Sequence, residues 1–526
     1  MNRAQRRRTG TPSRSRKLVV GSLALGGLVA SNLVAAAPAF ATETTVGCDK
    51  DELKTAIDSD SYSKITVAFA TPTCLMDLGS GANTFNIDGQ TLEIAGPSDK
   101  TWTIKASTAQ SVFNVPRTSV FTLKNVTIQG TGTNDQHAFY LGGGGLTSFT
   151  ADYVTVTSFD NNSVLFDAGM GALSSIAISH SSFTDNYAAI YAEGNLTISD
   201  SAFSNNSGGH YGSAITMLSG STGTITGSTF TGNSSTLAGG AIWSEGTLTV
   251  SDSTFTGNTA TAPENYDNFG GAIDSGSSSS LSVSHSTFDS NVAGDSNSSG
   301  YGGAISSFGE NSVFEGNLFT DNSASLLGGA LAVGVGMALN NSTFVDNSAT
   351  YDGAIYSEGG LISNSTFMNN STTNTAEYSM GGDSSVALFA NIVASDSAAQ
   401  KLVDPDLLDV AENLVTDDSL VLIPGSHSQK NVTLAQLNLK PLALYTKTPA
   451  NSGTTKTIGL GQGSIARDYY SELPIAPGAL PSSYHPMGSL SLPTVDQRGV
   501  ARVQGAAYDV GAYEGPAATI CTPGVL

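Results

Sequence analysis

Apolar and polar residues recur through the middle of this chain with steps of 20 to 33 residues, which indicates a structural repeat. Eight phenylalanines each precede an asparagine by three positions, and a small apolar cluster, often Gly-Gly-Ala-Ile, stands between consecutive copies. The pairs are Phe183 and Asn186, Phe203 and Asn206, Phe230 and Asn233, Phe255 and Asn258, Phe288 and Asn291, Phe319 and Asn322, Phe344 and Asn347, and Phe367 and Asn370. The period predicts a stack of similar coils.

The two halves of each repeat differ in how much their length varies. From an apolar cluster to the next Phe the spacing is 12 to 15 residues, as from Ile242 to Phe255. From a Phe to the following cluster the spacing runs from 7 to 18 residues. Length variation therefore falls on one side of the coil, where we expect the loops of a regular stack.

Short strands are predicted in the half of constant length. Leu248–Val250 and Leu281–Val283 alternate apolar with polar residues, which is the two-residue period of a β-strand. The repeats are rich in Ser, Thr, Gly and Asn and lack the i, i+3, i+4 apolar spacing of helical repeats. We therefore predict an all-β fold, a parallel β-helix with a small N-terminal helical cap and an irregular C-terminal region.

Stacking turns each repeated residue into a column, because successive coils lie about 4.8 Å apart. We expect the Phe column to fill the interior. The eight asparagines are expected at a sharp turn, where Asn tolerates positive φ and its amide can bond to the next Asn in a ladder. Ser stands two residues before each Phe except at Asn317, which supports the same register.

The N-terminal segment has the features of a secretory signal peptide. Seven basic residues from Arg3 to Lys17 precede an apolar run, and Ala39–Ala41 offers an A-x-A cleavage site. An uncleaved membrane anchor is the alternative. We divide the chain into a signal peptide at 1–41, an N-terminal cap at 42–80, β-helix repeats at 81–400 and a C-terminal region at 401–526, with no transmembrane segment in the mature chain.

The cap is predicted to contain a short amphipathic helix between two cysteines. Apolar Leu53, Ala56 and Ile57 follow early acidic residues, and a disulfide between Cys48 and Cys74 would staple this helix over the first coil. Cys521 is left over and is expected to be free, paired between chains, or a sign of a truncated tail.

The charge balance excludes some partners. Removal of residues 1–41 leaves 15 Lys plus Arg against 44 Asp plus Glu, a formal net charge of −29. So acidic a surface repels nucleic acid and anionic membranes, and neither is expected as a partner. No Lys or Arg occurs between Lys124 and Lys401, so the repeats present hydroxyls, amides and scattered carboxylates.

These patterns resemble known families. The array resembles right-handed parallel β-helix proteins with the pectin lyase-like fold, and its alternation of Gly-Gly-Ala-Ile with Phe-x-x-Asn is similar to the repeats of polymorphic outer-membrane adhesins. Asp496–Gly499 followed by Asp509–Glu514 resembles the choice-of-anchor Q domain, a surface-protein module placed before anchoring signals. The resemblance implies a secreted or cell-surface protein, adhesin-like, with Arg498, Asp509 and Glu514 as a structural salt-bridge set.

The C-terminal region departs from that module in two places. Asn451–Gly453 is Asn-Ser-Gly where Asn-Gly-Gly is usual, and Ser464–Asp468 is also altered. No apolar span, basic stop or sortase-type motif follows Glu514, so free secretion and a longer reading frame both stay open.

No catalytic residue for glycan cleavage is predicted. A β-helix lyase needs an Arg or Lys base beside acidic Ca²⁺ ligands. The array contains no Arg or Lys. A glycoside hydrolase needs two carboxylates about 5 to 9.5 Å apart. Glu193, Glu245 and Glu358 share one column on the first, third and seventh coils, so the nearest two are about 10 Å apart.

An enzyme stays open as an alternative to a non-enzymatic protein. Its site would lie on the loops between residues 255 and 305, where acidic residues gather in the sequence. These are Glu264, Asp267, Asp274, Asp289 and Asp295. Glycan depolymerisation abolished by changing one of them would favour this alternative.

No metal or other cofactor is predicted. His180 and His285 share a column but stand four coils, about 19 Å, apart, whereas zinc ligands lie about 2 Å from one ion. The rest of their column is Asp, Asn and Gly, so we interpret it as a turn.

One aromatic column suggests binding. Tyr211, Phe269, Tyr301 and Tyr351 stand four residues before the apolar cluster, where the variable loop rejoins the stack. They either cover the loop or stack on a sugar ring or a protein partner. The sequence therefore favours adhesin-like recognition of a glycan or an extracellular protein through the variable side of the stack, with a purely structural spacer as a third possibility.

Overall fold

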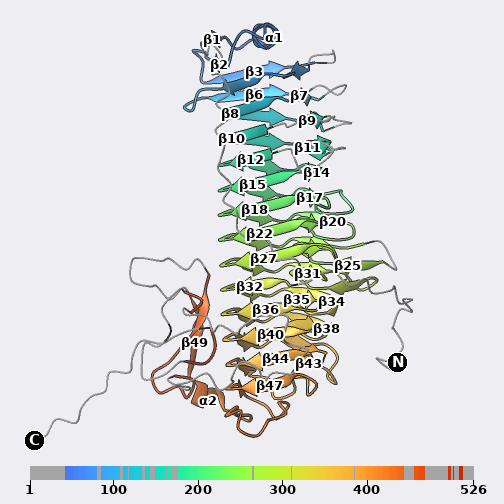
Figure 1. The fold of residues 1–526 in the computed structure, drawn as a ribbon, viewed down its shortest axis with the longest axis vertical. Coiled ribbons are helices and arrows are strands. Elements are labelled where there is room, and N and C mark those ends of the chain that lie inside the picture. Colours follow the sequence, from blue (N-terminus) through green and yellow to red (C-terminus); the bar gives the residue numbers. More distant parts are fainter. Residues whose placement is uncertain are drawn as a thin grey trace, which may run out of the picture. The chain divides into compact units, whose positions relative to one another are not determined.

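The computed structural model describes most of the chain from Thr42 onward, and Figure 1 shows this part as a stack of strands. The described residues are 42–79, 84–106, 111–116, 118–132, 137–142, 148–160, 163–168, 175–262, 266–309, 311–383, 385–443, 455–467, 496–498, 502 and 509–512. The expected signal peptide at 1–41, Glu264, Glu514 and Cys521 lie outside them. None of the helices within these ranges is long and apolar enough to cross a membrane.

The N-terminal cap contains one helix, α1 (Lys50–Asp58). Asp49 begins it by accepting hydrogen bonds from the backbone N–H groups of Asp51 and Glu52. The predicted apolar face, Leu53, Ala56 and Ile57, is buried. A disulfide joins Cys48, just before the helix, to Cys74 in the first coils.

A sheet of 27 strands, called the long sheet here, runs the length of the stack. Its N-terminal strands are β1 (Glu43–Val46), β2 (Lys64–Val67), β3 (Thr73–Asp77), β5 (Thr91–Ala95), β6 (Thr101–Lys105), β8 (Val120–Gln129) and β10 (Ser148–Thr157). From Ser175 each coil contributes two strands, one on each side of a bend. The strands before the bend are β12 (Ser175–Ser179), β15 (Asn195–Ser199), β18 (Thr222–Thr226), β22 (Thr247–Ser251), β27 (Ser280–Ser284), β32 (Val313–Glu315), β36 (Met337–Asn340), β40 (Gly360–Ser363), β44 (Val386–Phe389) and β47 (Leu408–Ala411). The strands after it are β13 (Ser182–Thr184), β16 (Ala202–Ser204), β19 (Thr229–Thr231), β23 (Thr254–Thr256), β28 (Thr287–Asp289), β33 (Leu318–Thr320), β37 (Thr343–Val345), β41 (Thr366–Met368), β45 (Ile392–Ala394) and β48 (Leu414–Val415).

Two further sheets complete the coils. The second sheet contains the apolar clusters and has 13 strands: β4 (Phe85–Asn86), β7 (Phe113–Pro116), β9 (Phe139–Gly142), β11 (Ser163–Ala168), β14 (Ala188–Ala192), β17 (Ile215–Met217), β21 (Ile242–Ser244), β26 (Ile273–Ser275), β31 (Ile305–Ser307), β35 (Leu331–Val333), β39 (Ile355–Ser357), β43 (Tyr378–Gly382) and β46 (Lys401–Val403). The flank sheet is built from the variable half of the repeat: β20 (Ser234–Ser235), β24 (Thr259–Ala260), β29 (Val292–Ala293), β34 (Ser323–Leu327), β38 (Ser348–Tyr351), β42 (Ser371–Thr372), β25 (Asp267–Phe269) and β30 (Ser299–Tyr301). Neighbouring strands in all three sheets are parallel, which confirms the predicted parallel β-helix.

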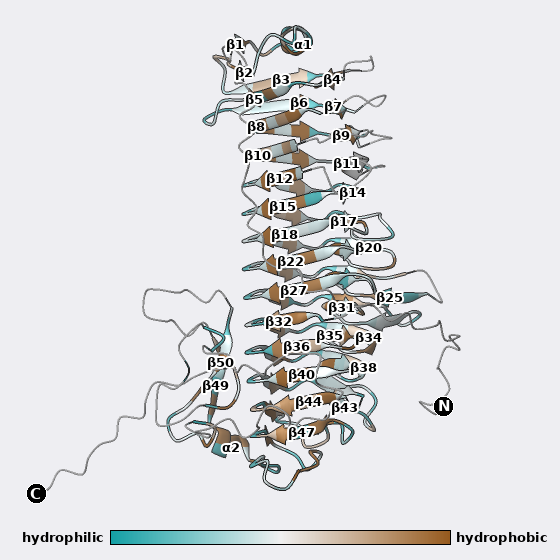
Figure 2. Ribbon diagram, in the orientation of Figure 1, coloured by the Kyte–Doolittle hydropathy of each residue, from teal (hydrophilic) through white to brown (hydrophobic). Residues whose placement is uncertain are grey.

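The interior is a set of apolar columns, as predicted. In Figure 2 the brown, hydrophobic positions recur on the strands of successive coils. The eight repeated phenylalanines are buried, and consecutive rings from Phe183 to Phe367 lie 4.6 to 5.1 Å apart and nearly parallel. This spacing is close to the strand spacing, so side chains of one type can stack without a gap.

The repeated asparagines form a buried hydrogen-bonded ladder. Asn258 shows the pattern: Nδ2 donates to Oδ1 of Asn291 in the next coil at 2.9 Å and to the carbonyl of Phe230 in the previous coil at 3.0 Å. Its own Oδ1 accepts from the backbone N–H and Nδ2 of Asn233. Both donors and the acceptor of this amide are therefore satisfied away from water, which limits the cost of burying it.

The residue with positive φ at this turn is not the ladder asparagine. It is the residue immediately before it, as in Gly257 with φ 61° and Asp346 with φ 54°. The expectation that the ladder Asn itself takes positive φ was therefore wrong. The preceding residue makes the tight turn, and the Asn side chain is thereby directed into the stack.

The Gly-Gly pair before four of the apolar clusters, those of Ile242, Ile273, Ile305 and Leu331, has a steric cause. In the coil that leads to Ile273, Gly270 has φ +60°, a conformation that favours glycine. A Cβ on Gly271 would lie 2.1 Å from the carbonyl oxygen of Gly303 and 2.5 Å from the backbone nitrogen of Val292. The flank sheet and the second sheet approach too closely there for any side chain.

The C-terminal region packs on the outer face of the strands after the bend. It contains α2 (Leu434–Leu437) and the antiparallel pair β49 (Leu439–Ala443) and β50 (Thr457–Leu460). Gln497 is completely buried: Nε2 donates to the carbonyl of Asn317, and Oε1 accepts from Thr343 Oγ1 at 2.6 Å. The motif that resembles the anchor module thus joins the C-terminal region to the coils.

The predicted salt-bridge set was Arg498, Asp509 and Glu514, but the ion pair seen in the described part of this region joins Arg498 to a residue outside that set. Arg498 pairs with Asp496, Nη2 to Oδ2 at 2.5 Å, with both side chains buried. Arg502 Nη1 donates to the carbonyl of Asp509 at 3.2 Å, and Arg502 also donates to the carbonyl of Gly511.

Candidate functional site

The four predicted aromatic residues lie in one register line at the edge of the flank sheet. Phe269 on β25 pairs with Tyr301 on β30, and Leu327 links Tyr301 to Tyr351. Ala238 bridges Tyr211 to Phe269. The column proposed from the sequence is therefore a real alignment of successive coils, although Ala238 and Leu327 interrupt its rings.

Two aromatic groups form along this line. The rings of Phe269 and Tyr301 stack 5.2 Å apart, and Phe269 meets Phe308 edge-on at 6.4 Å. Tyr211 lies 4.8 Å from Trp243 of the second sheet. Tyr211 is 42% exposed, whereas Phe269 and Tyr301 are half-buried. The rings thus contribute to packing and also reach the surface.

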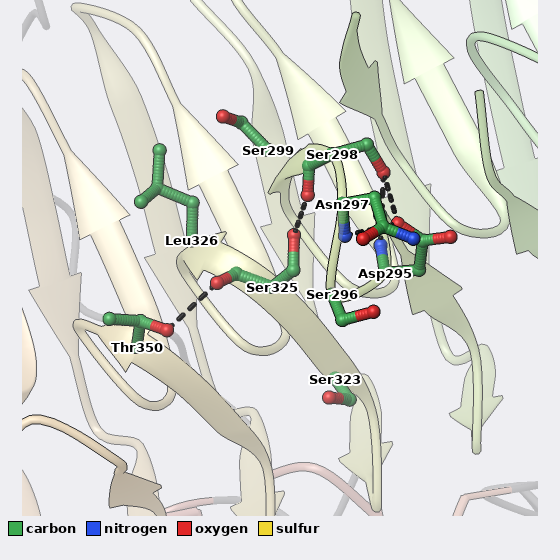
Figure 3. Close-up of a pocket in the computed structure, with 10 residues that line it drawn as sticks. Asp295, Ser296, Asn297, Ser298, Ser299, Ser323, Ser325, Leu326 and Thr350 are labelled. Carbon is green, nitrogen blue, oxygen red and sulfur yellow. Dashed lines mark hydrogen bonds between the residues drawn. The ribbon is translucent and has the colours of Figure 1, made fainter. Parts of the chain in front are cut away.

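A polar cavity of about 630 Å³ lies on the flank sheet (Figure 3). It is lined by Gly294, Asp295, Ser296, Asn297, Ser298, Ser299, Ser323, Ser325, Leu326 and Thr350. The loop between β29 and β30 forms one wall, and strands β34 and β38 form the other. Six of the lining side chains are Ser or Thr hydroxyls, which can both donate and accept hydrogen bonds.

Asp295 is the charged group of this cavity. Its Oδ1 accepts from the backbone N–H of Asn297 at 2.8 Å and from Ser298 Oγ at 2.9 Å. These hydrogen bonds hold the pKa of the Asp295 carboxyl below its ordinary value, and the one from the Asn297 N–H has the largest effect. The cavity therefore carries a fixed negative charge at neutral pH.

The ring pair and Ser299, one of the residues that line the cavity, lie on the same outer face of the paired strands β25 and β30. Asp267 pairs in register with Ser299, and Phe269 pairs with Tyr301. Alternate residues of a strand point to the same side, and the buried residues between them, Asn268 and Gly300, point inward. A carboxylate, a cavity-lining hydroxyl and two rings therefore lie within two residues of one another on adjacent strands.

Asp274 occupies a different, buried position on the second sheet. It is 8% exposed and follows the inward-facing Ile273 on β26, in register with Trp243 and Ser306. Burial raises the pKa of Asp274 to about 7, the Ser306 hydroxyl opposes this, and the charge of Glu245 adds to it. Asp274 is thus a carboxyl whose protonation changes near neutral pH, beside a second carboxyl.

The predicted column of glutamates is present, but the nearest carboxyl neighbour of Glu245 and of Glu358 is an aspartate and not another glutamate of the column. Glu245 is followed in the next coil by Gly276, and its carboxyl interacts with Asp274 of the adjacent column. Glu358 is followed by Asp383, and its pKa is raised by burial and then by the charge of Asp383. Asp383 follows Met380 at the same offset at which Glu358 follows Ile355, so the repeat spacing could have identified it.

The remaining predicted acids do not converge. Asp289 ends β28 in the long sheet, whereas Asp267 and Asp295 lie at the flank sheet and Asp274 lies on the second sheet. No group of three or more His, Cys, Asp or Glu side chains with the geometry of a metal site occurs in the described ranges.

The two histidines lie at the bend of the long sheet. His180 and His285 have φ of 47° and 49°, as expected of turn residues. His180 Nδ1 lies 2.9 Å from Asp152 Oδ1, and the His180 ring stacks on Tyr153.

One comparison with known protein families bears on the architecture. A family model described as a right-handed beta helix region matches residues 111–288. The chain is a right-handed parallel β-solenoid. No curated protein matches the sequence.

Two solved structures are distantly similar. Tailspike protein 3 of bacteriophage CBA120 is 15% identical with a TM-score of 0.31, and the match covers 69% of this chain. This chain spans 57% of that tailspike protein. The catalytic domain of a GH87 α-1,3-glucanase in complex with nigerose is 14% identical with a TM-score of 0.30, and the match covers 72% of this chain and 70% of that one.

Proposed function

We propose that this protein is an extracellular or cell-surface β-solenoid that binds a glycan through its flank sheet without cleaving it. The observation that carries the proposal is the outer face of β30, where Tyr301, stacked on Phe269 of β25, lies two residues from Ser299 of a hydroxyl-lined cavity. Aromatic faces pack against the apolar faces of sugar rings, and hydroxyls that both donate and accept match the hydroxyls of a sugar.

The location outside the cell rests on independent features. The disulfide between Cys48 and Cys74 is typical of oxidising compartments. Residues 1–41 have the composition of a secretory signal peptide. The similarity to the choice-of-anchor Q module and to adhesin repeats adds display at a surface to the proposal, although the buried Gln497 gives the motif a structural explanation as well.

Retention of the full chain on a panel of immobilised polysaccharides tests glycan binding. The variants Phe269→Ala and Tyr301→Ala should weaken retention about tenfold, the loss of one favourable aromatic contact of roughly 1.4 kcal/mol. Tyr153→Ala is the matched control, because Tyr153 is exposed and stacks on His180 at the bend of the long sheet. Retention of no polysaccharide, or unchanged retention by both variants together with a lower melting temperature, would overturn the proposal.

Glycan cleavage is a second candidate function, and Asp274 is the observation that favours it. A carboxyl with a pKa of about 7 can donate a proton near neutral pH, and Glu245 is the neighbouring carboxyl. Incubation of the bound polysaccharide with the protein, followed by reducing-end analysis, tests this function. Cleavage that is lost in both Asp274→Asn and Glu245→Gln would replace non-catalytic recognition by hydrolysis, and intact polysaccharide would exclude it for that substrate.

A further inference from the structure

The charges around the flank cavity are all negative in the described part of the chain. Asp295 lines the cavity, and Asp267 lies one strand away, in register with the cavity-lining Ser299. Both aspartates are exposed. No Lys or Arg occurs in the sequence between Lys124 and Lys401, so no basic residue of the array can neutralise them.

The two aromatic rings near these carboxylates can also attract a positive charge. The faces of Phe269 and Tyr301 carry the negative part of the aromatic quadrupole, which attracts a cation placed over the ring. A ligand that approaches this part of the flank sheet therefore meets negative potential from the carboxylates and from the exposed parts of the ring faces. An anionic sugar would be repelled there, and a neutral sugar could donate a hydroxyl hydrogen bond to a carboxylate but would lack the attraction between opposite charges.

The hydroxyl groups of the cavity indicate what other groups the ligand carries. Ser325 Oγ donates to the carbonyl of Ser298, and Thr350 Oγ1 donates to the carbonyl of Ser325, so this wall is held by its own hydrogen bonds (Figure 3). Hydroxyl oxygens in such a wall keep lone pairs that can accept from a ligand. The cavity therefore suits a polyhydroxylated molecule that also carries a hydrogen-bond-donating cation.

We propose that the flank cavity binds a polysaccharide that carries protonated amines, such as a chain of glucosamine units. One amine would lie between Asp295 and Asp267, and the adjacent sugar ring would pack on Tyr301 and Phe269. This proposal rests on glycan binding at the flank sheet and adds the charge of the ligand to it. A ligand with positive charge would also explain why this array contains no Lys or Arg.

A competition between matched oligosaccharides tests the charge preference. The full chain is titrated, by calorimetry at low ionic strength, with a glucosamine hexamer, its fully N-acetylated form, a neutral glucan hexamer and an oligogalacturonate. The glucosamine hexamer should bind most tightly and the oligogalacturonate most weakly. N-acetylation should cost about two- to fivefold for each carboxylate engaged, and added salt should reduce the difference.

The variants separate this proposal from the proposed function. Asp295→Asn and Asp267→Asn should each remove two- to fivefold of affinity for the glucosamine hexamer and leave binding of the N-acetylated form unchanged. Asp252→Asn is the matched control, because it removes one charge at the bend of the long sheet. Tight binding of the neutral or acetylated oligomers with no preference for the amine would overturn the amine proposal while glycan binding stands. Binding of none of the four oligomers would count against both.

Discussion

Two buried asparagines ten residues apart show how the two sides of each coil differ. Asn258, on the turn side, satisfies both amide donors and its acceptor through the coils above and below. Asn268, on the flank sheet, donates to the carbonyl of Leu237, but its Oδ1 has no hydrogen-bond partner among the described residues. The turn side is a closed, self-satisfied network, whereas the flank retains polar groups that its own coil does not use.

This difference explains where length varies. Each ladder Asn must meet the same atoms in the next coil, so an extra residue at the turn would break the register of every neighbour. The flank makes only short pairings, such as Thr259 and Ala260 with Val292 and Ala293, and loops between them can lengthen. The invariant side therefore sets the geometry on which the variable side presents its cavity and rings.

Insertions give the largest expected contrast. A Gly-Ser insertion between Gly257 and Asn258 should destabilise the protein by more than about 4 kcal/mol, because it moves a ladder amide out of register. The same insertion after Ser296 should cost less than about 1 kcal/mol, the entropy of a slightly longer loop. Urea unfolding followed by circular dichroism measures both. Equal costs at the two positions would contradict the division of the coil into two sides.

Alanine substitution of the two asparagines should give the next largest contrast. Asn258→Ala leaves the donors of Asn233 and the carbonyl of Phe230 without partners, which should cost about 3 to 5 kcal/mol. Asn268→Ala removes a buried acceptor that has no partner in the described part, so its cost should stay near or below about 1 kcal/mol. The free energies of unfolding from the same urea titrations test this, and a cost for Asn268→Ala as large as that for Asn258→Ala would be inconsistent with the comparison.

Asp274 on the second sheet predicts a pH dependence of stability. Because its folded pKa is about 7 and its ordinary value is 3.8, the folded state holds this proton more tightly than the unfolded state. The stability contributed by the protonated carboxyl is complete below about pH 4, declines as the pH rises to about 7, and is then lost, with an upper limit of about 4 kcal/mol. Asp274→Asn should therefore make the melting temperature depend less on pH between pH 5 and pH 8.

The neighbouring exposed Asp267 supplies the control for that experiment. Asp267→Asn removes a charge of the same sign from the adjoining flank sheet, where solvent screens it, so the pH profile should keep its wild-type slope. If Asp274→Asn and wild type gave parallel profiles, Asp274 would not be the group that titrates.

The sequence predicted the invariant side far better than the site. The period, the Phe stack and the Asn ladder follow from residues that repeat at fixed spacing, because stacking forces identical residues into contact. The helical cap follows instead from the spacing of its apolar residues. The neighbours of Asp274 do not follow from any column: Glu245 stands one coil earlier and two positions along the strand, so only the register shows that the carboxyls are close. The cavity walls come from a loop of one coil and strands of the next two coils. Because the loops differ in length from coil to coil, the repeat period alone does not predict that these segments lie together.

The smallest expected effect concerns the late coils, where the C-terminal region adds a cover to the turn side. Thr343 on β37 is buried and bonds to Gln497, whereas Thr256, also on a strand after the bend, is only half-buried. Gln497→Ala should cost about 1 to 3 kcal/mol, since it leaves the carbonyl of Asn317 and the Thr343 hydroxyl without this partner. Limited proteolysis should then release the C-terminal region while polysaccharide binding by the flank persists, and loss of both together would show that the cover and the flank are one cooperative unit.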